Sequence, residues 1–376
     1  MEQQMKLARN RESGQIFILV LILLALVPLL VIPMLRLSYS SQMYHQIVEI
    51  NTLNVYAADS GIEYALYQIY NYPSEIQETP LSENLTINGI DVHVTAEYDL
   101  DMADFTITST STKAGRSQTI ECVIVIDVGL FGNVIACDGN LTVMNCDFVN
   151  PEYPGESDVY THGNITLKSS YIDGDAKASG TISLQASTVT GDIIEGAEVL
   201  TFPEIDVQIH LDRAQAGGNH TGDYNTSDQS LGPIYIDGNL NIGSGDDVEL
   251  TGTVYVTGDV HMVYGNISGF GDIIAEGDII FDNYTYLIDN PVTLPLIMTI
   301  GVDKSIDIEN DIGDPGTMAI LYAANGIIDL ANLNLYGSVA APLVQLNNAM
   351  IHYPAELRGR ADLPGAGLDT VTYIFK

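Results

Sequence analysis

The hydrophobic pattern of the chain opens with Ile16–Leu35, a run of twenty consecutive apolar residues. As an α-helix this run would be about 30 Å long, the thickness of the hydrocarbon core of a bilayer. A helix satisfies its own backbone hydrogen bonds in lipid, so the run predicts a membrane span even with Pro28 and Pro33 inside it. A buried core helix and a cleaved secretory signal are the alternatives, but the run is longer than a signal peptide needs.

Beyond the apolar run, hydrophobic residues recur at helical spacing from Leu37 to Tyr67, with polar residues between them. Pro73 predicts that the helix ends near Asn71–Tyr72, because the residue before a proline disfavours helical geometry. Residues 15–72 should therefore form one rod that spans the membrane first and is amphipathic afterwards. The apolar stripe of the second half needs a partner.

Between residues 84 and 128 the hydrophobic pattern changes to period two, with turn signals at Asn88-Gly89, Asp99–Asp101 and Lys113–Arg116. Alternation of this kind is typical of half-buried strands. Residues 73–128 are therefore predicted to form a small antiparallel meander of three or four strands. We expect it to pack on the second half of the helix.

From Gly132 the chain repeats the pattern Gly-polar-apolar-x-apolar, as at Gly139, Gly163, Gly180, Gly238, Gly252, Gly258 and Gly277. Spacings of 17–19 residues between such glycines are typical of a parallel β-solenoid. We predict a solenoid over residues 129–356, interrupted by a polar loop at 213–233 and capped by the tail 357–376. The predicted fold class is mainly β: a long N-terminal transmembrane helix, an antiparallel β-meander and a parallel β-helix.

The repeat also predicts which side chains fill the solenoid. The inward positions would be Ile182, Leu184, Leu240, Ile242, Val254, Val256, Ile279 and Phe281. The outward positions between them would include Ser183, Asn241 and Tyr255. A carboxylate at an inward position would be buried without a partner, whereas an outward one should be tolerated.

Charge predicts the orientation of the span. Lys6, Arg9 and Arg11 precede it, so by the positive-inside rule the N-terminus stays in the cytoplasm and the rest lies outside, extracellular or periplasmic. The chain has 13 basic and 49 acidic residues, a net charge of −36. Such an acidic surface repels nucleic acid, which is therefore not an expected partner.

Two short motifs resemble those of pilins. Gly14, followed by Gln15 and an apolar helix, resembles a prepilin-type signal, which implies that a prepilin peptidase removes the leader 1–14. Ala57–Leu66 (AADSGIEYAL) resembles the AAEAGLE-x-AL block that follows the membrane helix in PilX-type minor pilins. Leu19 stands at the fifth mature position, where major pilins carry Glu, and this implies a minor or accessory subunit.

The resemblance implies partners and contact residues. The small residues Ala57, Ala58, Ser60 and Gly61 would let another helix of an assembly approach closely, and Glu63 is a charged member of the block. A solvated helix face is the alternative. Expected partners are the membrane, other pilin-like subunits, the pilus assembly machinery and the prepilin peptidase. The repeats resemble a solenoid domain of unknown function that follows PilX-like N-termini, and its candidate ligand is a surface glycan or a cell-envelope component.

Patterns for catalysis or metal binding are weak. Some parallel β-helices cleave acidic polysaccharides, which need cationic subsites, yet Lys168, Lys177, Arg213 and Lys304 are the only basic residues between Val128 and His352. Two candidate calcium sets, Gly243–Val248 and Asp303–Asp311, do not match a calcium loop. A third metal set, His220, Asp223 and Asp228, is explained as well by a solvated loop. Cys122, Cys137 and Cys146 lack zinc spacing, although Cys137 and Cys146 could form a disulfide outside the cell. We therefore expect that the protein is not an enzyme and that it binds no cofactor and no metal.

These observations predict a membrane-anchored minor pilin, or a pilin-like structural protein of a type IV pilus-related system, that displays an acidic solenoid for assembly or adhesion. One alternative is an uncleaved single-pass surface adhesin or envelope spacer. The other is a carbohydrate-active enzyme of β-helix fold, which would need carboxylates converging in a groove.

Overall fold

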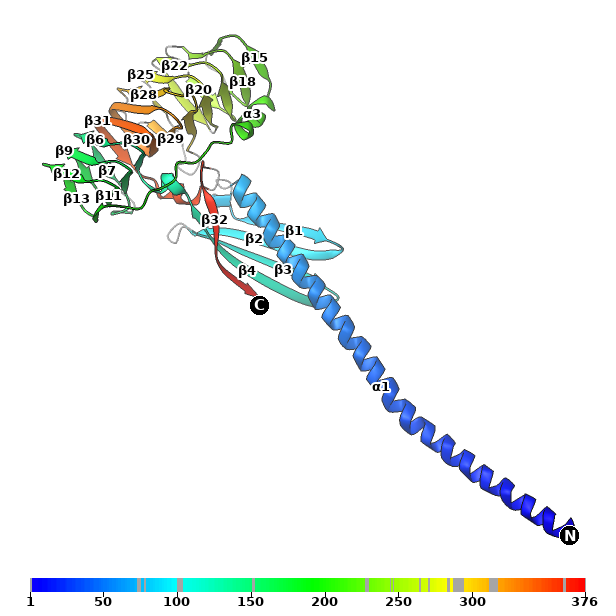
Figure 1. Ribbon diagram of the computed structural model, residues 1–376. Helices are drawn as coiled ribbons and strands as arrows, with labels where there is room; N and C mark the ends of the chain where they lie inside the picture. The colour runs from blue at the N-terminus through cyan, green and yellow to red at the C-terminus, as the bar shows by residue number, and fades with distance from the viewer. Residues whose placement is uncertain are drawn as a thin grey trace.

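The computed structural model describes residues 2–72, 76–77, 79–99, 104–150, 153–226, 230–243, 245, 247–263, 265–269, 271–282, 285–286, 294–310, 317–360 and 363–375. The chain forms a long helix, an antiparallel sheet and a parallel β-solenoid, in an extended molecule (Figure 1). The predicted fold class is therefore confirmed.

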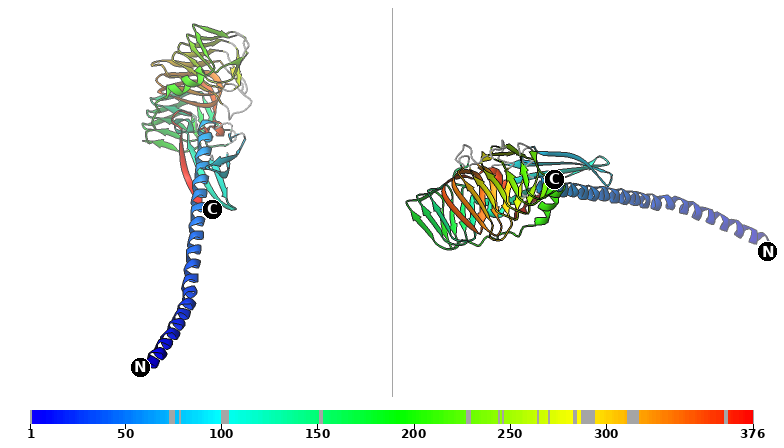
Figure 2. Two further views of the ribbon diagram at one scale, coloured as in Figure 1. Left: turned by 90° about the vertical axis from the view of Figure 1, so that its right-hand side faces the viewer. Right: turned by 90° about the horizontal axis from the view of Figure 1, so that it is seen from above.

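Helix α1 runs without interruption from Glu2 to Asn71, with Pro28 and Pro33 inside it. Its first half stands clear of the rest of the molecule in every view (Figure 2), and all residues from Phe17 to Gln46 are exposed. Its second half lies along one face of the antiparallel sheet. The division matches the change from a uniformly apolar to an amphipathic sequence.

The antiparallel sheet has five strands in the order β1-β2-β3-β4-β32. They are β1 (Leu81–Ile87), β2 (Ile90–Asp99), β3 (Asp104–Lys113), β4 (Arg116–Asp127) and β32 (Gly367–Phe375). The turns at Asn88-Gly89 and Ala114-Gly115 have positive φ at both residues, which matches the twist of a two-residue hairpin. Burial alternates along β2 and β3, so one face of the sheet packs on α1.

The solenoid is an insertion between β4 and β32. These strands are direct neighbours, with Asp127 paired to Gly367, and the chain between them builds the whole solenoid. It enters through the 3₁₀ turn η1 (Gly129–Gly132) and returns through η3 (Ala355–Gly359). The prediction that residues 357–376 cap the solenoid is therefore wrong. The alternating segment 370–375 (TVTYIF) is typical of a strand. A local pattern does not reveal that the partner of this strand, β4, is remote in sequence.

Two stretches of chain build the solenoid. The first contains β5 (Ile135–Cys137), β6 (Leu141–Met144), β7 (Asp147–Val149), β8 (Val159–Thr161), β9 (Ile165–Lys168), β10 (Tyr171–Ile172), β11 (Ala176–Ala178), β12 (Ile182–Gln185), β13 (Thr188–Val189) and β14 (Ile193–Glu195). The second begins with α3 (Val207–Gln215) and continues with β15 (Asn219–Thr221), β16 (Tyr224–Thr226), β17 (Ser230–Leu231), β18 (Ile234–Asp237), β19 (Leu240–Ile242), β20 (Asp247–Leu250), β21 (Val254–Val256), β22 (Val260–Val263) and β23 (Asn266–Gly269). It ends with β24 (Ile273–Ala275), β25 (Ile279–Asp282), β26 (Thr285–Tyr286), β27 (Leu296–Thr299), β28 (Ser305–Glu309), β29 (Thr317–Ala323), β30 (Ile327–Ala341) and β31 (Leu343–His352).

The spatial order of the coils differs from their order in the sequence. The chain starts in the middle of the stack at β5 and builds outward to β14. It then crosses to the far end, at β15, and builds back until β30 and β31 pair with β5, β6 and β7 (Figure 1). The predicted loop at 213–233 is also wrong, because this stretch holds the end of α3 and the strands β15, β16 and β17, whose short polar repeats hid the pattern.

Residues 196–206, here called the strap, make the crossing along one face of the solenoid, over the outward side chains of that face. Tyr255, Ile274, Met298 and Tyr322 stack there in one register column, each at most 2% exposed. The expectation that Tyr255 points to solvent is therefore wrong, because α3 packs on β18 and β21. Further along the column, the Tyr322 hydroxyl donates to the Pro203 carbonyl of the strap, and its ring lies against Phe131 of η1.

The inward register is otherwise as predicted, with exceptions at one end. Leu240, Ile242, Val254, Val256, Ile279 and Phe281 are all buried. Leu184 is 39% exposed and Ile182 is only partly covered, because β12 belongs to the last coil and, among the described strands, pairs with β9 alone.

Polar residues at the coil corners form ladders along the solenoid axis. The Asp259 carboxylate accepts the backbone N–H of Asp278, and the Asp278 carboxylate accepts that of Ser305. Glycine precedes these positions where coils approach closely: a Cβ on Gly163 would lie 2.5 Å from the Gly139 carbonyl oxygen. The repeated Gly-Asp and Gly-Asn pairs therefore serve the stacking of coils.

Candidate functional site

The first candidate site is the free half of α1. The helix from Phe17 to Asn71 contains a window of mean hydropathy 3.2 that the rest of the chain does not bury. Among the described residues this is the one helix with the length and composition of a membrane span. Its exposed leucines, isoleucines and valines can be buried in lipid or against other apolar helices. Gly14 and Gln15 lie within the same continuous helix, just before the apolar run.

The second half of α1 uses its small residues to approach its own sheet. Ala57 and Ala58 are 3% and 0% exposed, and they belong to the core that α1 shares with the sheet. A Cβ on Gly61 would lie 2.2 Å from Ser109 Oγ and 2.9 Å from Val94 Cγ2. The expected contact of Ala57, Ala58 and Gly61 with another helix is therefore replaced by packing within the chain.

The opposite side of this segment faces outward. Ser60 and Glu63 are exposed, and the Ser60 hydroxyl donates to the carbonyl of Tyr56 one turn earlier. A helix–helix contact through Ser60 and Glu63 stays a prediction. Asp59 accepts a hydrogen bond from the Tyr373 hydroxyl of β32, so the last strand is tied to the helix. Burial first, and the Asp59 carboxylate second, raise the pKa of Tyr373.

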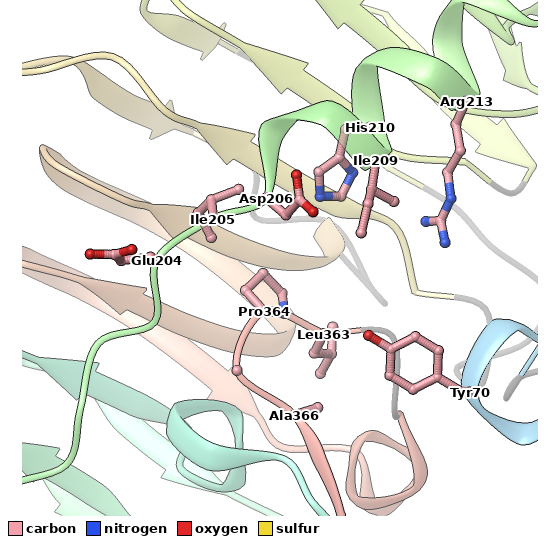
Figure 3. A pocket seen from close by; sticks show the side chains of 11 residues that line it. Tyr70, Glu204, Ile205, Asp206, Ile209, His210, Arg213, Leu363, Pro364 and Ala366 are labelled. Atoms are coloured by element: carbon pink, nitrogen blue, oxygen red, sulfur yellow. The ribbon is translucent and has the colours of Figure 1, made fainter. Parts of the chain in front are cut away.

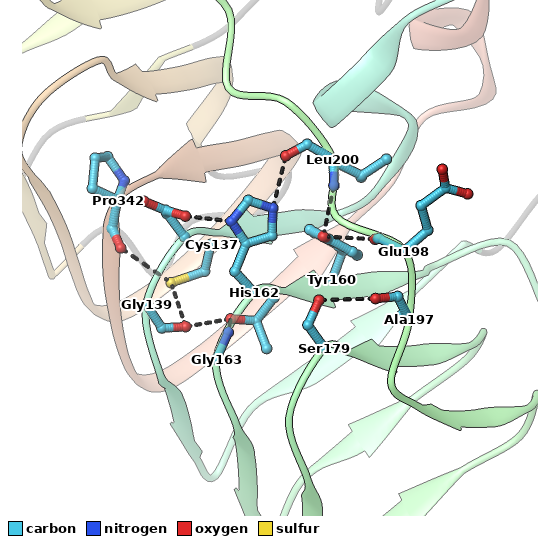
Figure 4. Close-up of polar contacts among 12 residues, drawn as sticks. Cys137, Gly139, Tyr160, His162, Gly163, Ser179, Ala197, Glu198, Leu200 and Pro342 are labelled. Carbon is cyan, nitrogen blue, oxygen red and sulfur yellow. Dashed lines mark hydrogen bonds and ion pairs between the residues drawn. The ribbon is translucent and has the colours of Figure 1, made fainter.

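Several side chains hold the strap on the solenoid (Figure 4). The Tyr160 hydroxyl donates to the carbonyl of Glu198 and accepts the N–H of Leu200, at 2.9 and 2.8 Å. The ring of His162 lies between Asp138 and the Leu200 carbonyl, 2.7 Å from the latter. Ser179 donates to the Ala197 carbonyl. These bonds explain why a segment without regular structure follows one defined path.

Two cavities lie beside the strap. The first, about 410 Å³, lies between the entry turn, Tyr160, Lys177 and Leu200. Lys177 donates to Asp158 at 2.6 Å and lies 3.3 Å from Asp175, so its charge is neutralised there. The second, about 190 Å³, lies between the end of α1, α3 and the segment that leads to β32; Tyr70, His210 and Arg213 line one side (Figure 3). Neither brings together a nucleophile, a base and an orienting group.

The described members of the metal candidates form no metal site. Among the described residues, no group of three or more His, Cys, Asp or Glu side chains is arranged to hold a metal ion. His220 Nε2 lies 3.3 Å from the Asp223 carbonyl oxygen, within the first coil of the returning stretch. Asp228, Ser244, Asp246 and Asp311 lie outside the described residues.

The three cysteines are buried and free. The Cys137 thiol lies near the carbonyl oxygens of Gly139 and Pro342, and the Cys146 thiol near that of Met144. Burial raises the pKa of all three thiols. The disulfide considered for Cys137 and Cys146 is not formed.

Half-buried carboxylates on one face of the solenoid oppose one another. Asp307 and Asp329 are direct neighbours on β28 and β30. Burial first, then Glu309, Asp329 and Asp282, raise the pKa of Asp307 above its ordinary value. No hydrogen bond from the described part of the chain reaches Asp307 Oδ1. The ionised form is therefore less favourable in the folded protein than in the unfolded chain.

Asp307→Asn is consequently expected to stabilise the protein at pH 7, by roughly 0.2–1 kcal/mol, the range for cross-strand charge pairs. The pKa of Asp307 is raised in the folded protein. The ionised Asp307 therefore destabilises the wild type fully at pH values above this raised pKa, and the destabilisation disappears as pH falls towards the ordinary carboxyl pKa. Urea unfolding at pH 7 and pH 4 measures this gain at pH 7 and its loss at pH 4. Glu97→Gln, at an exposed site on β2, is the control. An Asn variant less stable than the wild type at pH 7 would contradict the assignment.

Compared with known proteins, the chain matches no protein-family model and no curated protein. Among solved structures, it is similar to the crystal structure of the competence-associated pilin ComZ from Thermus thermophilus. The identity is 13% and the TM-score 0.29, with 87% of this chain and 98% of that chain covered.

Proposed function

We propose that the protein is a membrane-anchored, pilin-like surface protein. The observation that carries the proposal is the division of α1: about half of a single uninterrupted helix is bare and apolar, and the remainder packs on an antiparallel sheet. The first half fits a bilayer or a bundle of equivalent helices. The second half shares a packed core with the antiparallel sheet, so the helix and the head would move as one unit.

The finer proposal is a minor subunit of a type IV pilus-related assembly. Gly14, followed by Gln15 and then the apolar run, supports cleavage by a prepilin peptidase, and Leu19 in place of Glu supports a minor role. Subunit contacts would use the bare half of α1 and the exposed side that carries Tyr56, Ser60 and Glu63. Lys6, Arg9 and Arg11 support a cytoplasmic N-terminus, with the solenoid displayed outside.

The N-terminus tests this proposal. Mass spectrometry of the protein extracted from membranes is expected to find Gln15 as the first residue in cells with an active prepilin peptidase. Cells without the peptidase, and a Gly14→Val variant, should retain the leader. An intact Met1 in peptidase-active cells would favour the alternative, an uncleaved single-pass adhesin or envelope spacer.

A non-catalytic role for the solenoid is part of the proposal. Many of its carboxylates are engaged in stacking: Asp158, Asp175 and Asp259 each accept a backbone N–H from the next coil. We propose instead that exposed faces of the solenoid bind a surface glycan or a component of the cell envelope. Glycan-binding assays with the full chain would test it.

A further inference from the structure

One end of the solenoid is formed by β12, β13 and β14. Among the described strands, each pairs on one side only, with β9, β10 and β11. Leu184 and Ile193 are 39% and 50% exposed, whereas their register partners Leu167 and Ala176 are fully buried. This end therefore has the two features that invite strand pairing, an open edge and apolar side chains.

Glu195 occupies an unusual place at this end. It lies in register with Ala178, which is followed by Thr161 and Cys137 on the next strands, and these three side chains are fully buried. A carboxylate therefore stands in a column that elsewhere belongs to the core. Its Oε1 accepts the backbone N–H of Ile182 at 2.8 Å.

The accepted N–H belongs to the free edge of β12. On the inner side, the Ile165 N–H of β9 donates to the Thr181 carbonyl. The Ile182 N–H points the other way, to where the next strand of the stack would lie. Glu195 thus takes the hydrogen-bonding position of that missing strand.

The opposite end repeats the arrangement. His220 of β15 is in register with Ile236 and Val256, both fully buried, and its Nε2 lies 3.3 Å from the Asp223 carbonyl oxygen. At each end of the solenoid, a polar side chain thus occupies a register column that is buried in the interior coils. This placement supports a role for Glu195 and His220 in ending the stack.

The solenoid itself demonstrates that coils join without being consecutive in sequence. β30 and β31 pair with β5, β6 and β7 through ordinary parallel registers, although the Ser338 hydroxyl and the Asn133 carbonyl that bond there are 205 residues apart. An open coil edge of this chain can therefore accept another segment of suitable pattern. A second copy would present the same edge and the same apolar side chains, which suits a two-fold contact.

We propose that the Glu195 carboxylate is an autoinhibitory contact: it shuts the edge of β12 against strand pairing with a second copy of this chain. The contact acts through the hydrogen bond to Ile182, so removing the acceptor opens the edge. A substitution that removes only the negative charge of Glu195 keeps the acceptor, so the edge of β12 stays blocked. The proposal concerns the solenoid alone and does not depend on the role of α1.

The test compares variants of the full chain in detergent, each with a reporter cysteine at Ser183, an exposed position on β12. The three native cysteines are buried, so a bis-maleimide cross-linker should report the introduced one. Glu195→Leu with Ser183→Cys is expected to give at least several-fold more cross-linked dimer than Ser183→Cys alone. Glu195→Gln with Ser183→Cys should match Ser183→Cys alone, because the amide oxygen still accepts the Ile182 N–H.

The matched control places the cysteine at Asn241, which lies in the same register column but in an interior coil. Glu195→Leu with Asn241→Cys should show no increase in dimer. Glu195→Ala is run alongside, and melting temperatures verify folding, so that a misfolded Leu variant does not decide the result. No increase for either variant, an equal increase for Gln, or equal cross-linking at Asn241 would overturn the proposal.

Discussion

Ile242→Asp is expected to unravel the returning half of the solenoid. Ile242 is 4% exposed and lies between Thr226 of β16 and Met262 of β22. A carboxylate there is buried without a partner, at a cost of roughly 3–5 kcal/mol. Each coil is held mainly by its neighbours, so the damage should spread along the stack. Urea unfolding of the full chain, together with hydrogen exchange in β16–β25, measures both effects.

The matched control for this substitution is Asn241→Asp, one residue earlier on the outer side of the same strand. It should change the free energy of unfolding by no more than about 1 kcal/mol, which includes the loss of the Asn241 Nδ2 hydrogen bond to Asn225 Oδ1. Tyr255→Asp should resemble Ile242→Asp, since Tyr255 is 2% exposed, on a strand against which α3 packs. Equal stabilities of the Ile242 and Asn241 variants would show that the inward register is wrong.

The second large effect is expected from Gly61→Val, which should force α1 away from the antiparallel sheet. The new side chain would meet Ser109, Val94 and Val92, all buried in the interface between helix and sheet. Overpacking of this kind typically costs about 1–3 kcal/mol. Hydrogen exchange should rise in β2 and β3, while the solenoid keeps the protection of the wild type.

Ser60→Val is the control for Gly61→Val, because it adds the same branched side chain one residue away, at an exposed position. We expect little change in the exchange of β2 and β3 for this variant. If both variants loosened the sheet equally, the loss would come from the helix propensity of valine rather than from the missing space at Gly61.

The sequence predicted the elements that local pattern determines. Twenty apolar residues define the span, period-two alternation from residue 84 defines the meander, and repeated glycines define the coils. Pairing between remote segments has no local signal, so the insertion between β4 and β32 and the reversed order of the coils were not predictable. The tail strand β32 looks the same in sequence whether it caps a solenoid or completes a sheet.

The candidate contact residues show a similar limit. The small residues around Gly61 correctly indicate close packing of α1, but composition does not tell whether the neighbour is another subunit or the same chain's sheet. Tyr255 illustrates the converse case. Its alternation is that of an outward residue, and only the packing of the remote helix α3 on β18 and β21 places it in a second core.

The insertion between β4 and β32 determines how a mechanical load would travel through the molecule. Asp127 at the end of β4 pairs with Gly367 at the start of β32, so the two connections between sheet and solenoid leave the sheet side by side. The solenoid is therefore not attached through a single strand about which it could rotate. A pull on the solenoid therefore loads two neighbouring strands in parallel. The tension then passes across the sheet to the buried face of α1, and the Tyr373–Asp59 bond resists peeling of the last strand from the helix.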